Sequence, residues 1–130
     1  IDSLDPNILD WQQSLHLAAN KEDLAADVLK MLVDSFQQEL HEIEQLIELE
    51  DYPQLEHVLH RLYGATRYVG TPALQDVAGG FEQFVSTLRK ERRKADEAFV
   101  QETLNRANEL KAVMDQVQQV AQSILSKYEP

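Results

Sequence analysis

Apolar residues recur at helical spacing along almost the whole chain, and this pattern limits the possible folds more than any other feature of the sequence. Residues three and four apart share one face of an α-helix, whereas a half-buried strand requires apolar and polar residues to alternate. No stretch shows sustained alternation together with β-branched enrichment. We therefore expect an all-α fold.

Start and stop signals divide this pattern into one short helix and four long ones. Aspartate side chains can cap three of the helices, Pro72 suits the first turn of another, and Gly70 favours a stop. The capping aspartates are Asp10, Asp51 and Asp96. The predicted helices are residues 10–20, 22–49 and 52–69, one that begins at residue 72, and a last one that follows residue 96. Short connections between long helices predict an antiparallel four-helix bundle with a short extra N-terminal helix.

Length and composition favour a single domain over residues 1–130. Of the 130 residues, 43% are hydrophobic, which is enough for one core. The formal net charge of -11 repels nucleic acids and anionic lipid surfaces. The chain has no cysteine, which removes disulfides, thiolate metal sites and cysteine nucleophiles from consideration.

Neither a membrane span nor a signal peptide is evident in the sequence. No apolar run approaches the roughly 20 residues that cross a bilayer. The first residues, IDSLDPN, contain neither an initiator Met nor a basic and apolar leader. We expect the chain to be a piece of a longer polypeptide.

His60 lies in the third predicted helix, and helical geometry predicts which way it faces. Each residue advances the helix by about 100°, so relative to Leu55 the buried stripe comprises Leu59, Leu62, Thr66 and Val69, all within about 40°. His60 falls at about 140°, Gly64 at about 180° and Arg67 at about 120°, on the side away from the core. His60 is therefore expected to be exposed in the middle of the bundle.

Gly64, one turn after His60, is unexpected inside a helix. A helical glycine costs about 0.8 to 1 kcal/mol relative to alanine. The simple explanation is a solvated histidine beside a tolerated glycine; the functional one is that a side chain there would block whatever approaches the imidazole. A neutral imidazole is a good nucleophile toward phosphorus, and Arg67 could neutralise an anion held there. Phosphoryl transfer is the chemistry that fits this arrangement best.

A metal site is a weaker alternative. His57 and His60, three residues apart, could hold one ion with help from Glu56, but two exposed imidazoles without a clear third and fourth ligand make a poor site.

The same stretch resembles a known family. Residues His60, Leu62, Gly64, Gly70 and Leu74 in HRLYGATRYVGTPAL match the signature of histidine-containing phosphotransfer (HPt) domains. This stretch and the upstream segment LDWQQSLHLAANKEDLAADVLKMLV together resemble the C-terminal HPt module of hybrid sensor kinases of the BarA/GacS type. The resemblance covers most of the chain up to about residue 88. The resemblance implies that His60 accepts a phosphoryl group from a receiver-domain Asp and passes it to a response-regulator Asp in a two-component phosphorelay.

Further expectations come from the same resemblance. The domain would bind no ATP and no cofactor of its own, with Mg²⁺ supplied by the receiver; the sequence has no Gly-rich phosphate loop or Walker-type lysine. Gly64 would give access and Arg67 would stabilise the phosphoryl group. The residues expected to line the receiver-docking face are Glu56, His57, Arg61 and Tyr63. A polar residue, Glu82 or Gln83, is expected near His60.

One position departs from the family pattern. Many members carry a lysine immediately before the motif glycine, and here Tyr63 stands in its place. Its angle of about 80° places it at the edge of the core stripe, which leaves Arg67 more of the cationic role.

The resemblance also suggests the partners, the oligomeric state and the cellular location of the domain. The partners would be the receiver of the same hybrid kinase and that of a cognate response regulator, and the isolated domain would be a monomer. The domain would be cytoplasmic, in a parent chain anchored in the bacterial inner membrane. The alternative is a helical docking module that has lost phosphotransfer.

Two glycines and a run of cations complete the predictions. Gly79 and Gly80, inside the fourth helix, are expected to permit a bend or a close approach to the third helix. Residues 89–94, RKERRK, hold five of the 12 cationic residues. They could offset the helix dipole at the end of the fourth helix, or form a docking patch for an acidic receiver surface.

Overall fold

The computed structural model describes residues 5–128, which fold into helices and turns without a strand. The elements are α1 (Trp11–Leu17), α2 (Glu22–Glu48), α3 (Tyr52–Ala65), the 3₁₀ helix η1 (Thr66–Tyr68), α4 (Pro72–Lys90) and α5 (Glu97–Leu125). The prediction of an all-α fold is confirmed.

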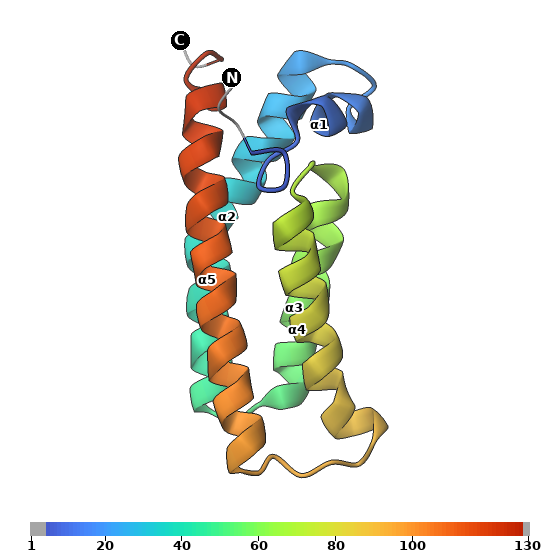
Figure 1. Ribbon diagram of the computed structural model, residues 1–130, viewed down its shortest axis with the longest axis vertical. Helices are drawn as coiled ribbons and strands as arrows, with labels where there is room; N and C mark the ends of the chain where they lie inside the picture. Colours follow the sequence, from blue (N-terminus) through green and yellow to red (C-terminus); the bar gives the residue numbers. More distant parts are fainter. Residues whose placement is uncertain (1–4, 129–130) are drawn as a thin grey trace.

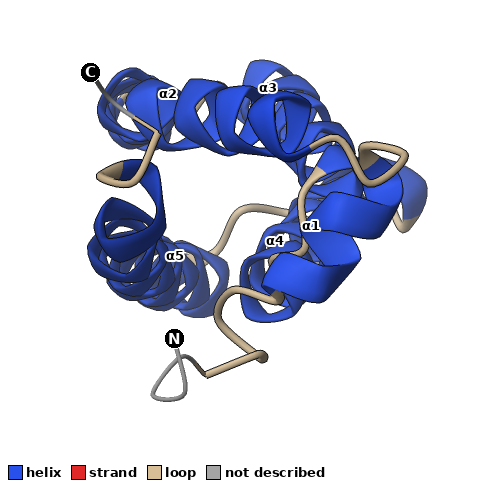
Figure 2. Ribbon diagram, turned by 90° about the horizontal axis from the view of Figure 1, so that it is seen from above, coloured by secondary structure: helices blue, strands red, loops and turns tan. Residues whose placement is uncertain are grey.

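The four long helices form an antiparallel bundle. Seen from above, α2, α3, α4 and α5 occupy the corners of a square, and consecutive helices are neighbours (Figure 2). Their directions alternate along the chain, and α1 sits over the end at which α3 gives way to α4 (Figure 1). The predicted four-helix bundle with a short extra N-terminal helix is therefore confirmed.

Three aspartates begin helices as the sequence predicted. In each case the side chain accepts a hydrogen bond from the backbone amide three residues further on, which satisfies an amide that has no partner within the helix. The pairs are Asp10 with Gln13 (3.0 Å), Asp51 with Gln54 (3.2 Å) and Asp96 with Phe99 (2.8 Å).

The third helix ends earlier than predicted. Its α-helical part stops at Ala65 instead of Val69, and the chain continues as η1. The Thr66 hydroxyl donates to the Tyr63 carbonyl at 2.6 Å, a local bond that competes with helical pairing, and Val69 is already extended. A 3₁₀ turn is a common end to a helix whose last turn tightens.

Gly70 fastens α1 to the connection between α3 and α4. Its carbonyl accepts from the Asp10 amide at 2.7 Å, and its own amide donates to the Ser14 hydroxyl at 2.9 Å. A Cβ at Gly70 would collide with the Asp10 carbonyl oxygen and would lie 3.0 Å from Gln13 Cβ. Only glycine permits this approach of two backbones. Half-buried Trp11, at the start of α1, lies with its ring centroid 6.2 Å from that of Tyr128 beyond α5.

The core follows the predicted stripe of α3, with exceptions on other helices. Leu55, Val58, Leu59 and Leu62 are at most 2% exposed. Three apolar residues that recur at helical spacing on α2 and α5 are nevertheless exposed; these are Leu24, Met31 and Leu104. Met31, at 72% exposure, lies about 200° around α2 from fully buried Leu29, so its side chain faces away from the core.

Candidate functional site

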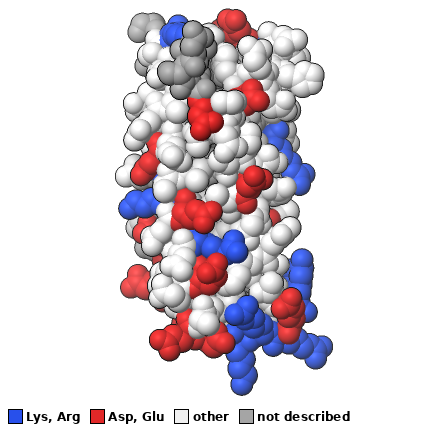
Figure 3. Space-filling view, in the orientation of Figure 1, with Lys and Arg blue, Asp and Glu red and all other residues white. Residues whose placement is uncertain are grey.

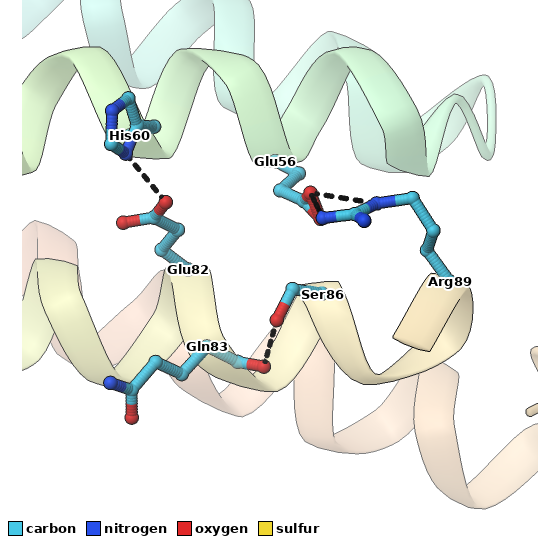
Figure 4. Close-up of polar contacts among 6 residues, drawn as sticks. All are labelled: Glu56, His60, Glu82, Gln83, Ser86 and Arg89. Carbon is cyan, nitrogen blue, oxygen red and sulfur yellow. Dashed lines mark hydrogen bonds and ion pairs between the residues drawn. The ribbon is translucent and has the colours of Figure 1, made fainter. Parts of the chain in front are cut away.

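His60 stands on the solvent side of α3, beside α4. Its side chain is 70% exposed, and its Nδ1 lies 2.7 Å from Oε2 of Glu82, a residue of α4 (Figure 4). Glu82 is the less exposed partner, at 21%. The predicted exposure of His60 is confirmed, and of the two polar residues expected near it, Glu82 is the one that makes contact. Gln83 points away, and its carbonyl accepts from Ser86 (Figure 4).

The contact with Glu82 determines which ring nitrogen is free to react. A carboxylate oxygen only accepts hydrogen bonds, so Nδ1 carries the proton in this pair. Nε2 then keeps its lone pair, because a neutral imidazole has one proton for two nitrogens. The negative charge of the Glu82 carboxylate beside Nδ1 also stabilises any positive charge that develops on the ring. The arrangement makes Nε2 an exposed nucleophile with a fixed tautomer.

Gly64 has no packing role within the domain. A Cβ built there meets no atom within 4 Å, leaving aside the neighbouring residues and the helix's own backbone. Alanine would therefore fit and would suit a helix better. The absence of a side chain beside His60 has no explanation in the bundle itself.

Arg67 and Tyr63 lie together on the C-terminal side of His60. The Arg67 guanidinium carbon is 5.2 Å from the centroid of the Tyr63 ring, within cation–π range. The half-buried ring packs against α4 at Gly79, where a Cβ would lie 2.8 Å from Tyr63 Cε1. The expected close approach of α3 and α4 is thus found at Gly79, whereas the helix α4 runs on unbroken through both glycines.

Two predicted docking residues are held by ion pairs with neighbouring helices. Glu56 accepts a forked pair of hydrogen bonds from Arg89 of α4, the shorter at 2.8 Å (Figure 4). Arg61 donates to Glu39 and Glu42 of α2 at 3.0 and 3.2 Å. The hydrogen bond with Glu39, with smaller contributions from Glu42, raises the pKa of Arg61 above its ordinary value. These pairs fix α3 against both neighbours, and a docking role for Glu56 and Arg61 stays a prediction.

His57 is exposed on the same side of α3 as His60, and its docking role likewise stays a prediction. Glu56, its possible partner in a metal site, is occupied by Arg89. Within residues 5–128, no three histidine, cysteine or acidic side chains come together as metal ligands.

An apolar recess beside α3 was not predicted from the sequence. It has a volume of about 430 Å³ and lies between α2 and the end of α3. Met31 and Tyr68, 72% and 70% exposed, are on its rim, and Arg61 is one of its lining residues. Helical periodicity gave no signal for the recess, because it forms where α2 meets the end of α3, whereas Met31 lies about 200° around α2 from the buried Leu29.

Comparison with known proteins identifies the family. Residues 27–120 match the family model described as the Hpt domain. The chain belongs to the Hpt domain family. A solved structure, described as the HPT domain from the Hpt sensor hybrid histidine kinase from Shewanella, superposes with a TM-score of 0.77 at 26% identity, covering 95% of this chain and 97% of that one.

Curated relatives of this Hpt domain are sensor kinases. Sensor protein GacS of Pseudomonas syringae pv. syringae is 44% identical over 70 residues, which are 54% of this chain and 8% of GacS. Signal transduction histidine-protein kinase BarA of Shigella flexneri is 35% identical over 89 residues, 68% of this chain and 10% of BarA. The Hpt domain thus matches no more than a tenth of the length of these relatives. The resemblance to BarA and GacS modules is confirmed.

A helix must be about 20 residues long and predominantly apolar to span a bilayer. In the part of the chain from residue 5 to residue 128, no helix is both long and apolar enough.

Proposed function

We propose that this Hpt domain is a phosphorelay intermediate: His60 takes a phosphoryl group from an aspartyl phosphate of a receiver domain and passes it to an Asp of a response regulator. The observation that carries the proposal is the bond between Nδ1 of His60 and Glu82, which leaves Nε2 as an exposed nucleophile. Membership of the family supports the reaction class.

The transfer step balances without a cofactor on this chain. The Nε2 lone pair of His60 forms the new bond to phosphorus, and the bond from phosphorus to the Asp oxygen breaks, returning the carboxylate to the receiver. The product is a phosphoramidate whose ring keeps its proton on Nδ1. Glu82 stabilises the positive charge that the ring gains as the new bond forms. Transfer to the next Asp is the reverse of this step.

Gly64 and Arg67 are proposed to serve the incoming phosphoryl group. Because nothing within the domain fills the space at Gly64, the receiver can bring its aspartyl phosphate in line with Nε2. The long side chain of Arg67 runs back along α3 to lie over Tyr63, which follows His60 by three residues. We place its guanidinium beside the phosphoryl oxygens, with the Tyr63 ring as its support.

Mg²⁺ is proposed to come with the receiver. Mg²⁺ binds through one or two carboxylates together with phosphate oxygens, and the aspartyl phosphate of a receiver supplies such oxygens. The Hpt domain would then contribute the nucleophile, its tautomer and one cation, and would bind no cofactor of its own.

The proposed partners are the receiver of the same hybrid kinase and that of a cognate response regulator, with the domain acting as a monomer. The exposed apolar recess at Met31 and Tyr68 supports protein docking on this side of α3, since such surfaces are typical of interaction sites. His57 and Arg61 would lie within the same contact. By analogy with the sensor kinases it resembles, we place the domain in the cytoplasm, in a parent chain anchored in the inner membrane.

The experiment that tests this function follows label from a phosphorylated receiver, with Mg²⁺, onto the Hpt domain. We expect acid-labile, alkali-stable label on the wild type and none on His60→Gln, with equal helicity by circular dichroism. His41→Gln, at an exposed histidine of α2, is the matched control and should accept label. Absence of label on the wild type with several receivers would overturn the proposal and leave a docking module without phosphotransfer.

A further inference from the structure

The turn after α4 carries a concentration of positive charge on an acidic molecule. Residues 89–94, which we call the basic turn, hold five cations and one acid and have a net charge of +4. Since the whole chain has a net charge of -11, the other 124 residues together carry -15. In Figure 3 the cations gather at the lower end of the molecule, where α4 leads into α5, while acidic side chains are scattered over the rest of this face.

Interactions within the domain account for two of the five cations. Arg89 is paired with Glu56, and Arg93 lies over the rings of Phe84 and Phe99 at 5.9 and 5.4 Å. The remaining three are exposed and make no ion pair or ring contact with another described residue; they are Lys90, Arg92 and Lys94. Lys90 suits the dipole at the C-terminus of α4, but Arg92 and Lys94 lie beyond the helix.

Arg92 also occupies a position that favours glycine. Its φ of 51° is left-handed, and the following amide of Arg93 closes the helix end on the Leu88 carbonyl at 3.1 Å. A helix end of this kind most commonly carries glycine. The backbone conformation at this position therefore does not explain why the residue is an arginine.

The basic turn lies within reach of a partner bound at His60. The Glu56–Arg89 pair and the His60–Glu82 pair bridge the same two helices, one after the other along their seam (Figure 4). On α4, Lys90 follows Glu82, the partner of His60, by eight residues, about 12 Å along the helix axis. A typical protein contact covers about 800 Å² on each partner, roughly 30 Å across. A receiver centred on His60 would therefore extend to the basic turn.

We propose that the basic turn is an electrostatic docking site for the phosphodonor receiver, in which Lys90, Arg92 and Lys94 attract the acidic face that surrounds its aspartyl phosphate. This inference rests on the proposed function. A face that carries an aspartyl phosphate and the carboxylates that bind Mg²⁺ is anionic, and it would be repelled by the other 124 residues. The basic turn attracts that face and orients it toward the seam of α3 and α4. Anionic lipid is a poorer fit because the same negative charge opposes a flat membrane surface.

The test compares two double variants with the same net charge. One is Lys90→Glu with Lys94→Glu in the basic turn; the other is Lys111→Glu with Lys127→Glu, two exposed lysines of α5 and the turn after it. The second-order rate constant for label transfer from a phosphorylated receiver is measured at low and at high salt. We expect the first pair to lower it about tenfold at low salt, with the gap closing at high salt, and the second pair to change it less than twofold.

A third variant separates charge from folding. Arg92→Gly removes one cation while giving the left-handed position its preferred residue, so it should keep or raise the melting temperature and still slow transfer at low salt. The inference would be overturned if the transfer rate fell equally in the two double variants, or fell in neither. It would also be overturned if the basic-turn variant transferred label normally but no longer bound vesicles containing phosphatidylserine. If the proposed function holds, label still reaches His60 at high protein concentration in each of these cases. Failure of the docking inference can therefore be distinguished from failure of the proposed function.

Discussion

Two glycines six residues apart have opposite surroundings in this domain. Gly70 is enclosed by the backbone of α1, and a Cβ there would collide with the Asp10 carbonyl. Gly64 faces open space beside His60. Both belong to the signature that relates the chain to its family, yet only Gly70 is explained by the fold. The comparison separates a glycine that the packing of the bundle requires from one whose open space we propose is kept clear for a partner.

Replacing Gly70 should have the largest effect on folding. Gly70→Ala forces α1 away from the α3–α4 connection, and overpacking of this kind costs about 1 to 3 kcal/mol. Urea unfolding followed by circular dichroism measures the loss. Ser14→Ala, which removes one hydrogen bond to Gly70, should cost about 1 kcal/mol. If Gly70→Ala slowed phosphotransfer in the folded protein as well, the separation of the two regions would fail.

Removing Glu82 should affect transfer and leave folding nearly unchanged. Glu82→Ala frees Nδ1 of His60, and we expect transfer to slow about 10- to 100-fold, the range known for groups that orient metal-binding histidines. Glu82→Gln can still accept from Nδ1 but lacks the charge, so it should fall between Glu82→Ala and the wild type. The readout is the single-turnover rate of label transfer.

The neighbouring residue provides the control for Glu82. Gln83→Ala alters an exposed side chain that points away from His60 and should leave the rate unchanged (Figure 4). Unchanged transfer in Glu82→Ala would mean that the contact with His60 has no part in the reaction.

Gly64→Ala should move stability and transfer in opposite directions. The new methyl group meets no atom of the packed domain, so the free energy of unfolding should rise by up to about 1 kcal/mol. Transfer from the receiver should slow several-fold because the methyl group stands in its path. Urea titration and single-turnover transfer, measured on the same preparation, give both quantities.

Gly80→Ala is a matched comparison, because its Cβ would be at an ordinary 3.4 Å from an Arg106 nitrogen of α5, away from His60. It should be stabilising without slowing transfer. A Gly64→Ala domain that transfers at the wild-type rate would leave the glycine unexplained.

The smallest expected effect concerns the support of Arg67. Tyr63→Leu removes the ring beneath the guanidinium, a cation–π contact worth about 0.5 to 1 kcal/mol at an exposed site, which corresponds to a two- to five-fold lower transfer rate. Tyr63→Phe keeps the ring and should retain the rate. Equal rates in Tyr63→Leu, Tyr63→Phe and the wild type would show that Arg67 needs no such support.

The sequence predicted well the features that depend on one helix at a time. The three aspartate caps follow from a local hydrogen bond, and the exposure of His60 follows from its angle to Leu55 on the same helix. The burial of Thr66 and Val69 is likewise confirmed, even though the α-helix ends before them.

Features that depend on how two helices meet were predicted less completely. Glu82 lies 22 residues from His60, and its contact depends on the register between α3 and α4, which side-chain packing sets. The family pattern narrowed the choice to two adjacent residues, and only the packed bundle distinguished them. The recess likewise depends on how α2 and the end of α3 meet, and the angle of Met31, about 200° around α2 from Leu29, shows only that its side chain faces away from the core.

The docking of α1 on Gly70 also gives the molecule an optical reporter. Trp11 is the only tryptophan of the chain, and it stands at the first position of the helix that Gly70 holds in place. Its emission should therefore report detachment of α1, while the His60 seam contains no indole. Fluorescence and phosphate label together would record the two regions independently in a single sample.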